Sequence, residues 1–232
     1  MIALPEVIIL ETAAVSAAQG RLWPTEEKLL AQSRSPRRQE FTAGRTLARQ
    51  ALARAGQPDQ ALLADAQRCP IWPPGISGSI SHTHTWCAVA IAPTSAVTSL
   101  GIDIEEAGRV KPDLWRMLFT EGEHADLKAL AEEPRQAWAD CLFSIKEAFY
   151  KYQFPLTQKM VHFQDVEIER SSEEGTAIIR ILKSILAPLE TDVCLKAYYH
   201  LEKENNLVWT AVYGEPIADP SMGQVIEREQ DN

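Results

Sequence analysis

Residues 99–105 have the sequence SLGIDIE, whose alternation of apolar and acidic side chains predicts a β-strand. Positions i and i+2 of a strand project from the same face, so Asp103 and Glu105 should lie side by side, opposite Ile102 and Ile104. Adjacent carboxylates repel each other, and a hard cation such as Mg²⁺ relieves that repulsion. A bare pair of this kind is also typical of the exposed face of an amphipathic strand, so the pair alone leaves both interpretations open.

A long helix is predicted to begin near Pro134 and to run through DCLFSIKEAFYKYQF as far as Pro155. Glu147 and Lys151 are four residues apart in it and therefore share a face. They either form a surface ion pair, worth about 0.3–0.5 kcal/mol, or they complete the metal site and hold a phosphate.

Shorter elements flank these two segments. Three more helices are predicted at 24–32, 36–55 and 120–131, with Thr25, Ser35 and Thr120 near their starts as caps and Glu123 completing a capping box. Strands are predicted at 7–10, 79–86, 87–92, 161–170, 176–182, 193–202 and 207–214, with a turn at 204–206 and a loop at 68–78. The polar segment 215–232 is predicted to be disordered.

The charge distribution argues against nucleic acid as a ligand, because the net charge is −9 and the pI is about 5.1. Residues 34–54 nevertheless hold six arginines against one acid, Glu40. This segment predicts either a small anionic ligand or a solvated helix face.

The location of the protein is predicted from its cysteines and its N-terminus. The four cysteines lack CxxC spacing, residues 1–10 lack the features of a signal peptide, and the apolar runs are too short to span a bilayer. We therefore expect a cytoplasmic protein that is not bound to membranes.

The segment GSISHT, residues 78–83, could bind phosphate through its backbone, hydroxyl and imidazole groups. His82 and His84 could instead form a metal pair, but no third nitrogen or sulfur ligand follows at a familiar zinc spacing, which disfavours that interpretation.

In this order and spacing, GSISHT, GIDIE and FSIKEAFYK resemble the 4′-phosphopantetheinyl transferase superfamily, and most closely the type that serves enterobactin-like siderophore, nonribosomal-peptide and polyketide synthetases. The resemblance covers roughly residues 36–170. It implies an enzyme that moves the 4′-phosphopantetheine arm of coenzyme A to a serine of an apo carrier protein and releases adenosine 3′,5′-bisphosphate. Phe143 stands where many members of the family have Trp.

The resemblance also implies roles for individual residues. Asp103, Glu105 and Glu147 would bind Mg²⁺, Glu147 would act as the base directly or through water, and Lys151 would contact the pyrophosphate with help from Lys146. The coenzyme A phosphates and nucleotide would be contacted by further residues, namely Arg45, Arg68, Ser81, His82 and, as weaker candidates, Arg37 and Arg38.

The family fold implied is α+β, with two similar α/β halves about a pseudo-twofold axis. We place the N-terminal, coenzyme A phosphate-binding half at 1–100 and the C-terminal, metal-binding and catalytic half at 101–214. A faint echo between WCAVAIAP (86–93) and WTAVYGEP (209–216) supports a duplication and hence a monomer. Phe119, Leu127 and Leu130 are either a docking surface for the carrier or ordinary core. Two alternatives stay open for the whole chain, a non-catalytic coenzyme A-binding module and a Mg²⁺-dependent phosphohydrolase.

Overall fold

The computed structural model describes residues 2–30, 34–183, 186 and 193–216. Strands β1 (Ile9–Ala14), β3 (Trp86–Pro93) and β2 (Ile76–His82) form a three-stranded antiparallel sheet in that order. A second, five-stranded sheet has the order β4 (Ser99–Glu106), β8 (Leu207–Pro216), β7 (Val193–Glu202), β6 (Thr176–Ile181) and β5 (Val166–Arg170). Helices accompany both sheets, which confirms the α+β class.

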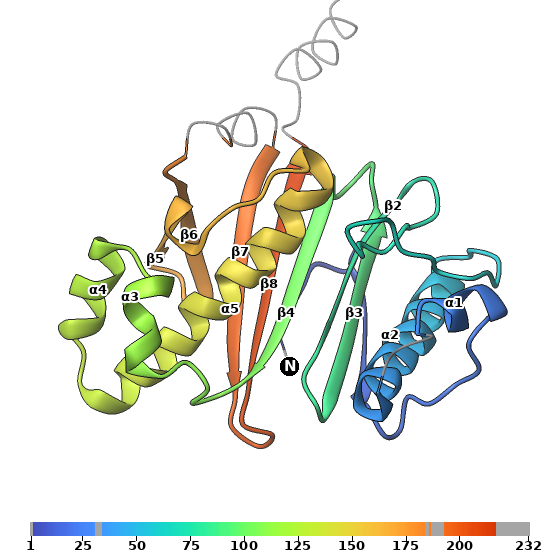
Figure 1. Ribbon diagram of the computed structural model, residues 1–232. Helices are drawn as coiled ribbons and strands as arrows, with labels where there is room; N and C mark the ends of the chain where they lie inside the picture. Colours follow the sequence, from blue (N-terminus) through green and yellow to red (C-terminus); the bar gives the residue numbers. More distant parts are fainter. Residues whose placement is uncertain (1, 31–33, 184–185, 187–192, 217–232) are drawn as a thin grey trace, which may run out of the picture.

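The two long helices cover the two sheets, as Figure 1 shows. Helix α2 (Ser35–Arg54) packs on the three-stranded sheet, and α5 (Glu132–Thr157) packs on β4 and β8. The shorter helices are α1 (Pro24–Lys28), α3 (Trp115–Leu118) and α4 (Glu121–Lys128), and single 3₁₀ turns lie at Pro112–Leu114 and Phe163–Asp165.

Strand β3 is apolar on both faces because it lies between two layers of core. Cys87, Val89 and Ile91 pack toward α2, whereas Ala88 and Ala90 pack toward β4 and β8 of the other sheet. A third cluster of buried side chains lies between α5 and the five-stranded sheet. The sheets therefore pack on each other, with a long helix outside each.

Strand β4 has the alternation that its sequence predicts. Ile102 and Ile104 belong to the core between the sheets, whereas Asp103 faces α5, where it bonds to Ser144 and Lys151. The predicted contrast between an apolar and an acidic face is confirmed.

Several predicted boundaries are wrong by one or a few residues. The cap of α1 is Trp23 rather than Thr25, and the cap of α2 is Arg34 rather than Ser35. Helix α5 starts at Glu132 and includes Pro155, because a proline near the last turn loses only one helical bond. Thr120 and Glu123 do form the predicted capping box of α4.

The strand predictions need three corrections. The predicted strand 79–86 spans the end of β2, a turn and the start of β3, while β2 already begins at Ile76, inside the predicted loop. The predicted strand 161–170 starts with a 3₁₀ turn, and the strand predicted at 7–10 occupies Ile9–Ala14. Glu215 and Pro216 belong to β8, and the rest of the tail predicted to be disordered lies outside the described residues.

Candidate active site

Asp103 lies at the centre of the predicted acidic site, with 4% of its surface exposed. Its Oδ1 accepts hydrogen bonds from Ser81 Oγ at 2.9 Å and from Lys151 Nζ at 2.7 Å. Its Oδ2 accepts a hydrogen bond from Ser144 Oγ at 2.8 Å. Donors from β2 and α5 therefore hold one carboxylate of β4, and the Lys151 ammonium compensates the buried charge.

Lys151 reaches Asp103 because α5 crosses β4 at very close range. A Cβ at Gly101 would stand 1.9 Å from the carbonyl oxygen of Ala148, so only glycine allows this crossing. Lys151 Nζ also donates to Ser81 Oγ at 2.9 Å and to the carbonyl of Ile102 at 3.1 Å. The crossing thus brings the helix lysine onto the strand carboxylate.

Glu105 and Glu147 add negative charge around Asp103. Burial raises the pKa of Glu105 to about 7, reinforced by Asp103 and Glu147 and opposed by Arg109 and Lys151. Burial and the charge of Asp103 also raise the pKa of Glu147, against the effect of Lys151. Three carboxylates therefore share one crowded, partly desolvated environment.

The chemistry of these three groups suits Mg²⁺, which prefers carboxylate oxygens and phosphate oxygens. Within the described part of the chain, no three His, Cys, Asp or Glu side chains already stand in a metal-binding arrangement. Lys151 instead occupies Oδ1 of Asp103. The residues fit a divalent cation in donor type and charge, and their side chains would turn to bind it.

A cavity of about 750 Å³ lies between α1, α2, the loop before β2 and the end of β2. It brings together Arg45, Arg68 and His82, three of the residues singled out in the sequence, and adds Arg37 and Lys28. Two acids, Glu40 and Asp65, also line it. Four cationic side chains around one cavity favour an anionic ligand that carries several negative charges.

Arg45 is a buried cationic side chain in the wall of this cavity. Its guanidinium lies 4.3 Å above the ring of Phe41, and only 5% of the residue is exposed. Burial lowers the pKa of Arg45 to about 10, and its Nε has no hydrogen-bond partner among the described residues. A buried N–H without a partner is costly, and a bound anion would satisfy it.

Arg68 is presented to the cavity by a tight loop. Its φ of 69° is uncommon for a residue other than glycine. Asp65 holds the loop, because its carbonyl accepts from the Arg68 N–H at 3.0 Å and its Oδ1 accepts from the Cys69 N–H at 2.8 Å. This conformation turns the arginine toward the cavity wall.

Ser81 and His82 lie on opposite faces of β2, because adjacent strand residues alternate. Ser81 points to Asp103 and Lys151, whereas His82 points to the cavity beside α2. Strand β2 therefore joins the acidic site to the arginine-lined cavity.

Two polar residues at these sites were missed in the sequence. Ser144 bonds to Asp103, and its signal was a small polar residue in an apolar stretch, seven positions before Lys151 and therefore on the same helical face. Glu40 contacts Arg37, His82 and the exposed His84, and its signal was that it is the single acid among six arginines.

The structure does not bring Lys146 to the acidic site or to the arginine-lined cavity. Its side chain is 1% exposed, and its Nζ bonds to Glu123 Oε2 at 2.7 Å and to three backbone carbonyls at 2.6–3.2 Å. One helical position turns a side chain by about 100°, so Lys146 faces α4 while Glu147 stays near Asp103.

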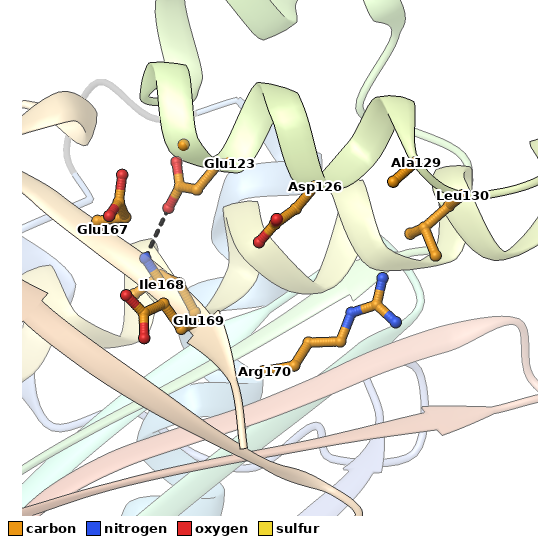
Figure 2. Close-up of a pocket in the computed structure, with 9 residues that line it drawn as sticks. Glu123, Asp126, Ala129, Leu130, Glu167, Ile168, Glu169 and Arg170 are labelled. Atoms are coloured by element: carbon orange, nitrogen blue, oxygen red, sulfur yellow. Dashed lines mark hydrogen bonds between the residues drawn. The ribbon is translucent and has the colours of Figure 1, made fainter. Parts of the chain in front are cut away.

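Glu123 belongs to the wall of a separate cavity between α4 and β5, shown in Figure 2. It accepts a hydrogen bond from the Ile168 N–H at 2.7 Å, drawn as the dashed line in that figure. Lys146 and Glu123 thus fasten α5, α4 and β5 together.

The structure does not bring Arg38 to the arginine-lined cavity. Arg38 pairs with Glu27 and lines a different hollow beside Gln19 and Thr42. The neighbouring Arg37 lines the cavity instead.

Of the two interpretations of the segment before and within α4, docking surface or ordinary core, the structure favours core. Phe119 and Leu127 are 1% and 0% exposed, and Leu130 packs against the same core. Phe119 and Leu127 are core residues, and Leu130 is a partly buried side chain packed against them.

The fold and the site define a class, namely an α+β enzyme whose acidic centre lies beside a cationic cavity. Comparison with known families makes this specific. Residues 25–92 match the 4′-phosphopantetheinyl transferase N-terminal domain, and residues 99–211 match the 4′-phosphopantetheinyl transferase superfamily. The chain belongs to this superfamily.

Curated relatives support the assignment. The chain is 34% identical over 162 residues to the 4′-phosphopantetheinyl transferase Svp of Streptomyces mobaraensis, covering 69% of this chain and 66% of that protein. It is 34% identical to Npt of Nocardia iowensis, covering 66% of this chain and 68% of Npt. It is 32% identical to PptT of Mycobacterium tuberculosis, covering 68% of this chain and 71% of PptT. The matches thus span about two thirds of the relatives' length.

Solved structures were also found. Holo-[acyl-carrier-protein] synthase from Thermotoga maritima matches 57% of this chain and 74% of its own, with a TM-score of 0.42 and 19% identity. The synthase from Bacillus anthracis, solved in complex with CoA (3′,5′-ADP), matches 53% of this chain and 99% of its own, with a TM-score of 0.42 and 22% identity.

Proposed function

We propose that this enzyme transfers the 4′-phosphopantetheine arm of coenzyme A to a serine of an apo acyl, peptidyl or aryl carrier protein. The serine oxygen forms a bond to the β-phosphorus, the pyrophosphate bond breaks, and adenosine 3′,5′-bisphosphate leaves. The observation that supports this most is that β2 joins the Asp103–Lys151 site to the arginine-lined cavity. Coenzyme A carries a pyrophosphate and a separate 3′-phosphate, so one molecule could occupy both the acidic site and the cavity.

In this proposal the cavity binds the nucleotide end of coenzyme A. Arg45 offers its unpaired, buried Nε–H, and Arg37 and Arg68 offer two more guanidinium groups. Ser81 and Lys151 lie on the other face of β2 and would meet the pyrophosphate.

The catalytic step is assigned to the acidic site. Asp103, Glu105 and Glu147 would hold Mg²⁺, which when bound supplies positive charge against the pyrophosphate oxygens. Glu147 is proposed as the base that takes the proton from the carrier serine, directly or through water.

We further propose that residues 1–100 supply the coenzyme A phosphate-binding half and residues 101–214 the metal-binding, catalytic half, and that the enzyme acts as a cytoplasmic monomer. Cys69, Cys87 and Cys141 are free thiols, which suits a reducing compartment. No helix among the described residues is long and apolar enough to cross a membrane.

The test separates this function from its alternatives. Coenzyme A, Mg²⁺ and the enzyme are incubated with and without an apo carrier protein, and nucleotide products are separated by chromatography. We expect adenosine 3′,5′-bisphosphate only when the carrier is present. Release of phosphate or nucleotide without the carrier would indicate a phosphohydrolase, and binding of coenzyme A without any product would indicate a non-catalytic module.

A further inference from the structure

A carboxylate lies inside the cation-rich cavity, where it would repel an anionic ligand. Glu40 is on α2 and its side chain is only 10% exposed. Its Oε1 lies 2.9 Å from His84 Nδ1, and its Oε2 lies 3.7 Å from both His82 Nδ1 and Arg37 Nη1. The Glu40 carboxylate therefore lies within 3.7 Å of three basic groups.

The geometry fixes how the His82 ring carries its proton. Arg37 Nη1 lies 2.7 Å from His82 Nε2, and a guanidinium can only donate, so Nε2 is the acceptor. The ring hydrogen is then on Nδ1, which faces Glu40. In this state His82 is neutral and its Nε2 has no hydrogen to offer to a phosphate.

We propose that Glu40 is a positioning residue whose negative charge, placed behind the His82 ring, allows His82 to take up a proton and donate from Nε2 to a ligand phosphate. If Arg37 turns its N–H toward a bound phosphate, its hydrogen bond to His82 Nε2 is lost. Nε2 can then accept a proton from solvent. Ligand binding therefore leads to protonation of Nε2 from solvent, while Nδ1–H still points toward Glu40. The ring then carries a positive charge. The inference rests on the proposed function, because it takes coenzyme A as the ligand.

The other groups around His82 set the direction of the effect. Burial lowers the pKa of His82, Glu40 raises it, and Arg37 from α2 and Lys151 from α5 lower it. His84, next to the end of the same strand, shares the Glu40 carboxylate. A dianionic phosphate would offset the two cations, so the pKa of His82 rises on binding and a proton is taken up.

Proton uptake makes affinity depend on pH in one direction. Between the pKa of His82 in the free protein and its higher value in the complex, binding tightens as the pH falls. We expect coenzyme A to bind about three- to fivefold more tightly at pH 6 than at pH 8, because a pKa rise of about one unit gives its full tenfold effect only at pH values below both pKa values.

The experiment is calorimetry of coenzyme A binding without Mg²⁺, at pH 6 and pH 8, in buffers of different ionisation enthalpy. Wild type should take up a proton. Glu40→Gln should lose this uptake and bind about three- to fivefold more weakly at pH 6, but within about twofold at pH 8. The same measurement on His82→Asn gives the proton uptake or release that comes from the ligand phosphates alone. The difference from wild type is the proton taken up by the imidazole. Glu27→Gln, which removes an equal charge beside Arg38 outside the cavity, should behave as wild type.

Other results would overturn the inference. Tighter binding by Glu40→Gln at both pH values would mean that Glu40 merely repels the ligand. Wild-type binding without uptake by His82 would leave the proposed function standing and remove the inference, whereas no binding at all would remove both. If Glu40→Gln does not fold, ¹⁵N NMR of the wild-type His82 ring decides, since a ring that stays neutral when coenzyme A binds contradicts the proposal.

Discussion

The carboxylate of Glu105 is partly buried next to the carboxylates of Asp103 and Glu147. Its pKa of about 7, raised by burial and by Asp103, means that the folded, metal-free protein binds a proton there that the unfolded chain releases near pH 4.5. Stability contributed by this group is therefore present below about pH 4.5 and is lost as the pH rises through 7.

We expect Glu105→Gln to raise the melting temperature of the metal-free protein at pH 8 but to leave it nearly unchanged at pH 5. At pH 8 the wild type must keep a charged, crowded carboxylate, whereas the amide is neutral. Thermal unfolding at the two pH values measures the difference. Equal effects at both pH values would contradict the electrostatic description of the site.

At the same scale, some site residues could be predicted and others could not. Strand alternation was enough to pair Asp103 with Glu105, and helical spacing was enough to pair Glu147 with Lys151. The inward direction of Lys146 depends on which side of α5 meets α4, which is a tertiary fact. The same holds for Arg37 and Arg38, because the sequence does not say which of two adjacent arginines faces the cavity.

At the scale of elements, the crossing of α5 over β4 determines the site. Gly101→Ala would place a methyl group 1.9 Å from the Ala148 carbonyl oxygen, which forces helix and strand apart. Overpacking of this kind costs about 1–3 kcal/mol of unfolding free energy or more. We expect a lower denaturation midpoint together with reduced transfer activity, because Lys151 would move away from Asp103. An alanine variant with wild-type stability and activity would show that the crossing is looser than described.

The buried pair of Lys146 and Glu123 fastens α4 and β5 to α5, so we expect it to affect folding and not coenzyme A binding. Lys146→Met leaves the buried Glu123 carboxylate without its cation and should cost about 3–5 kcal/mol in unfolding free energy. Denaturant unfolding measures this loss. Lys146→Met with Glu123→Leu should recover part of it, since both charges are then removed.

Calorimetry of coenzyme A binding completes this comparison. We expect the affinity of folded Lys146→Met to stay near that of the wild type. A stable variant with greatly weakened binding would indicate that Lys146 does contact coenzyme A.

At the scale of the whole molecule, the helix, strand and class predictions succeeded where local pattern decides, as in β4 and the capping box of α4. They failed at boundaries such as the turn between β2 and β3, where Thr83 and Trp86 close the hairpin with a backbone hydrogen bond inside a strand-like sequence. The arginine-lined cavity forms where α1, α2 and the loop carrying Arg68 pack together. Local sequence patterns do not predict this packing.

In the proposed reaction, one acidic site and one cationic cavity act together on coenzyme A and a carrier serine. The most direct measurement is the intact mass of an apo carrier protein after incubation with the enzyme, coenzyme A and Mg²⁺. We expect a gain of one phosphopantetheine arm on the serine, at a rate reduced at least about 100-fold by Asp103→Asn and unaffected by the control Glu106→Gln on the same strand. No mass gain on acyl, peptidyl or aryl carriers with the folded wild-type enzyme would contradict the proposed transfer, and full activity in Asp103→Asn would contradict the role of the acidic site.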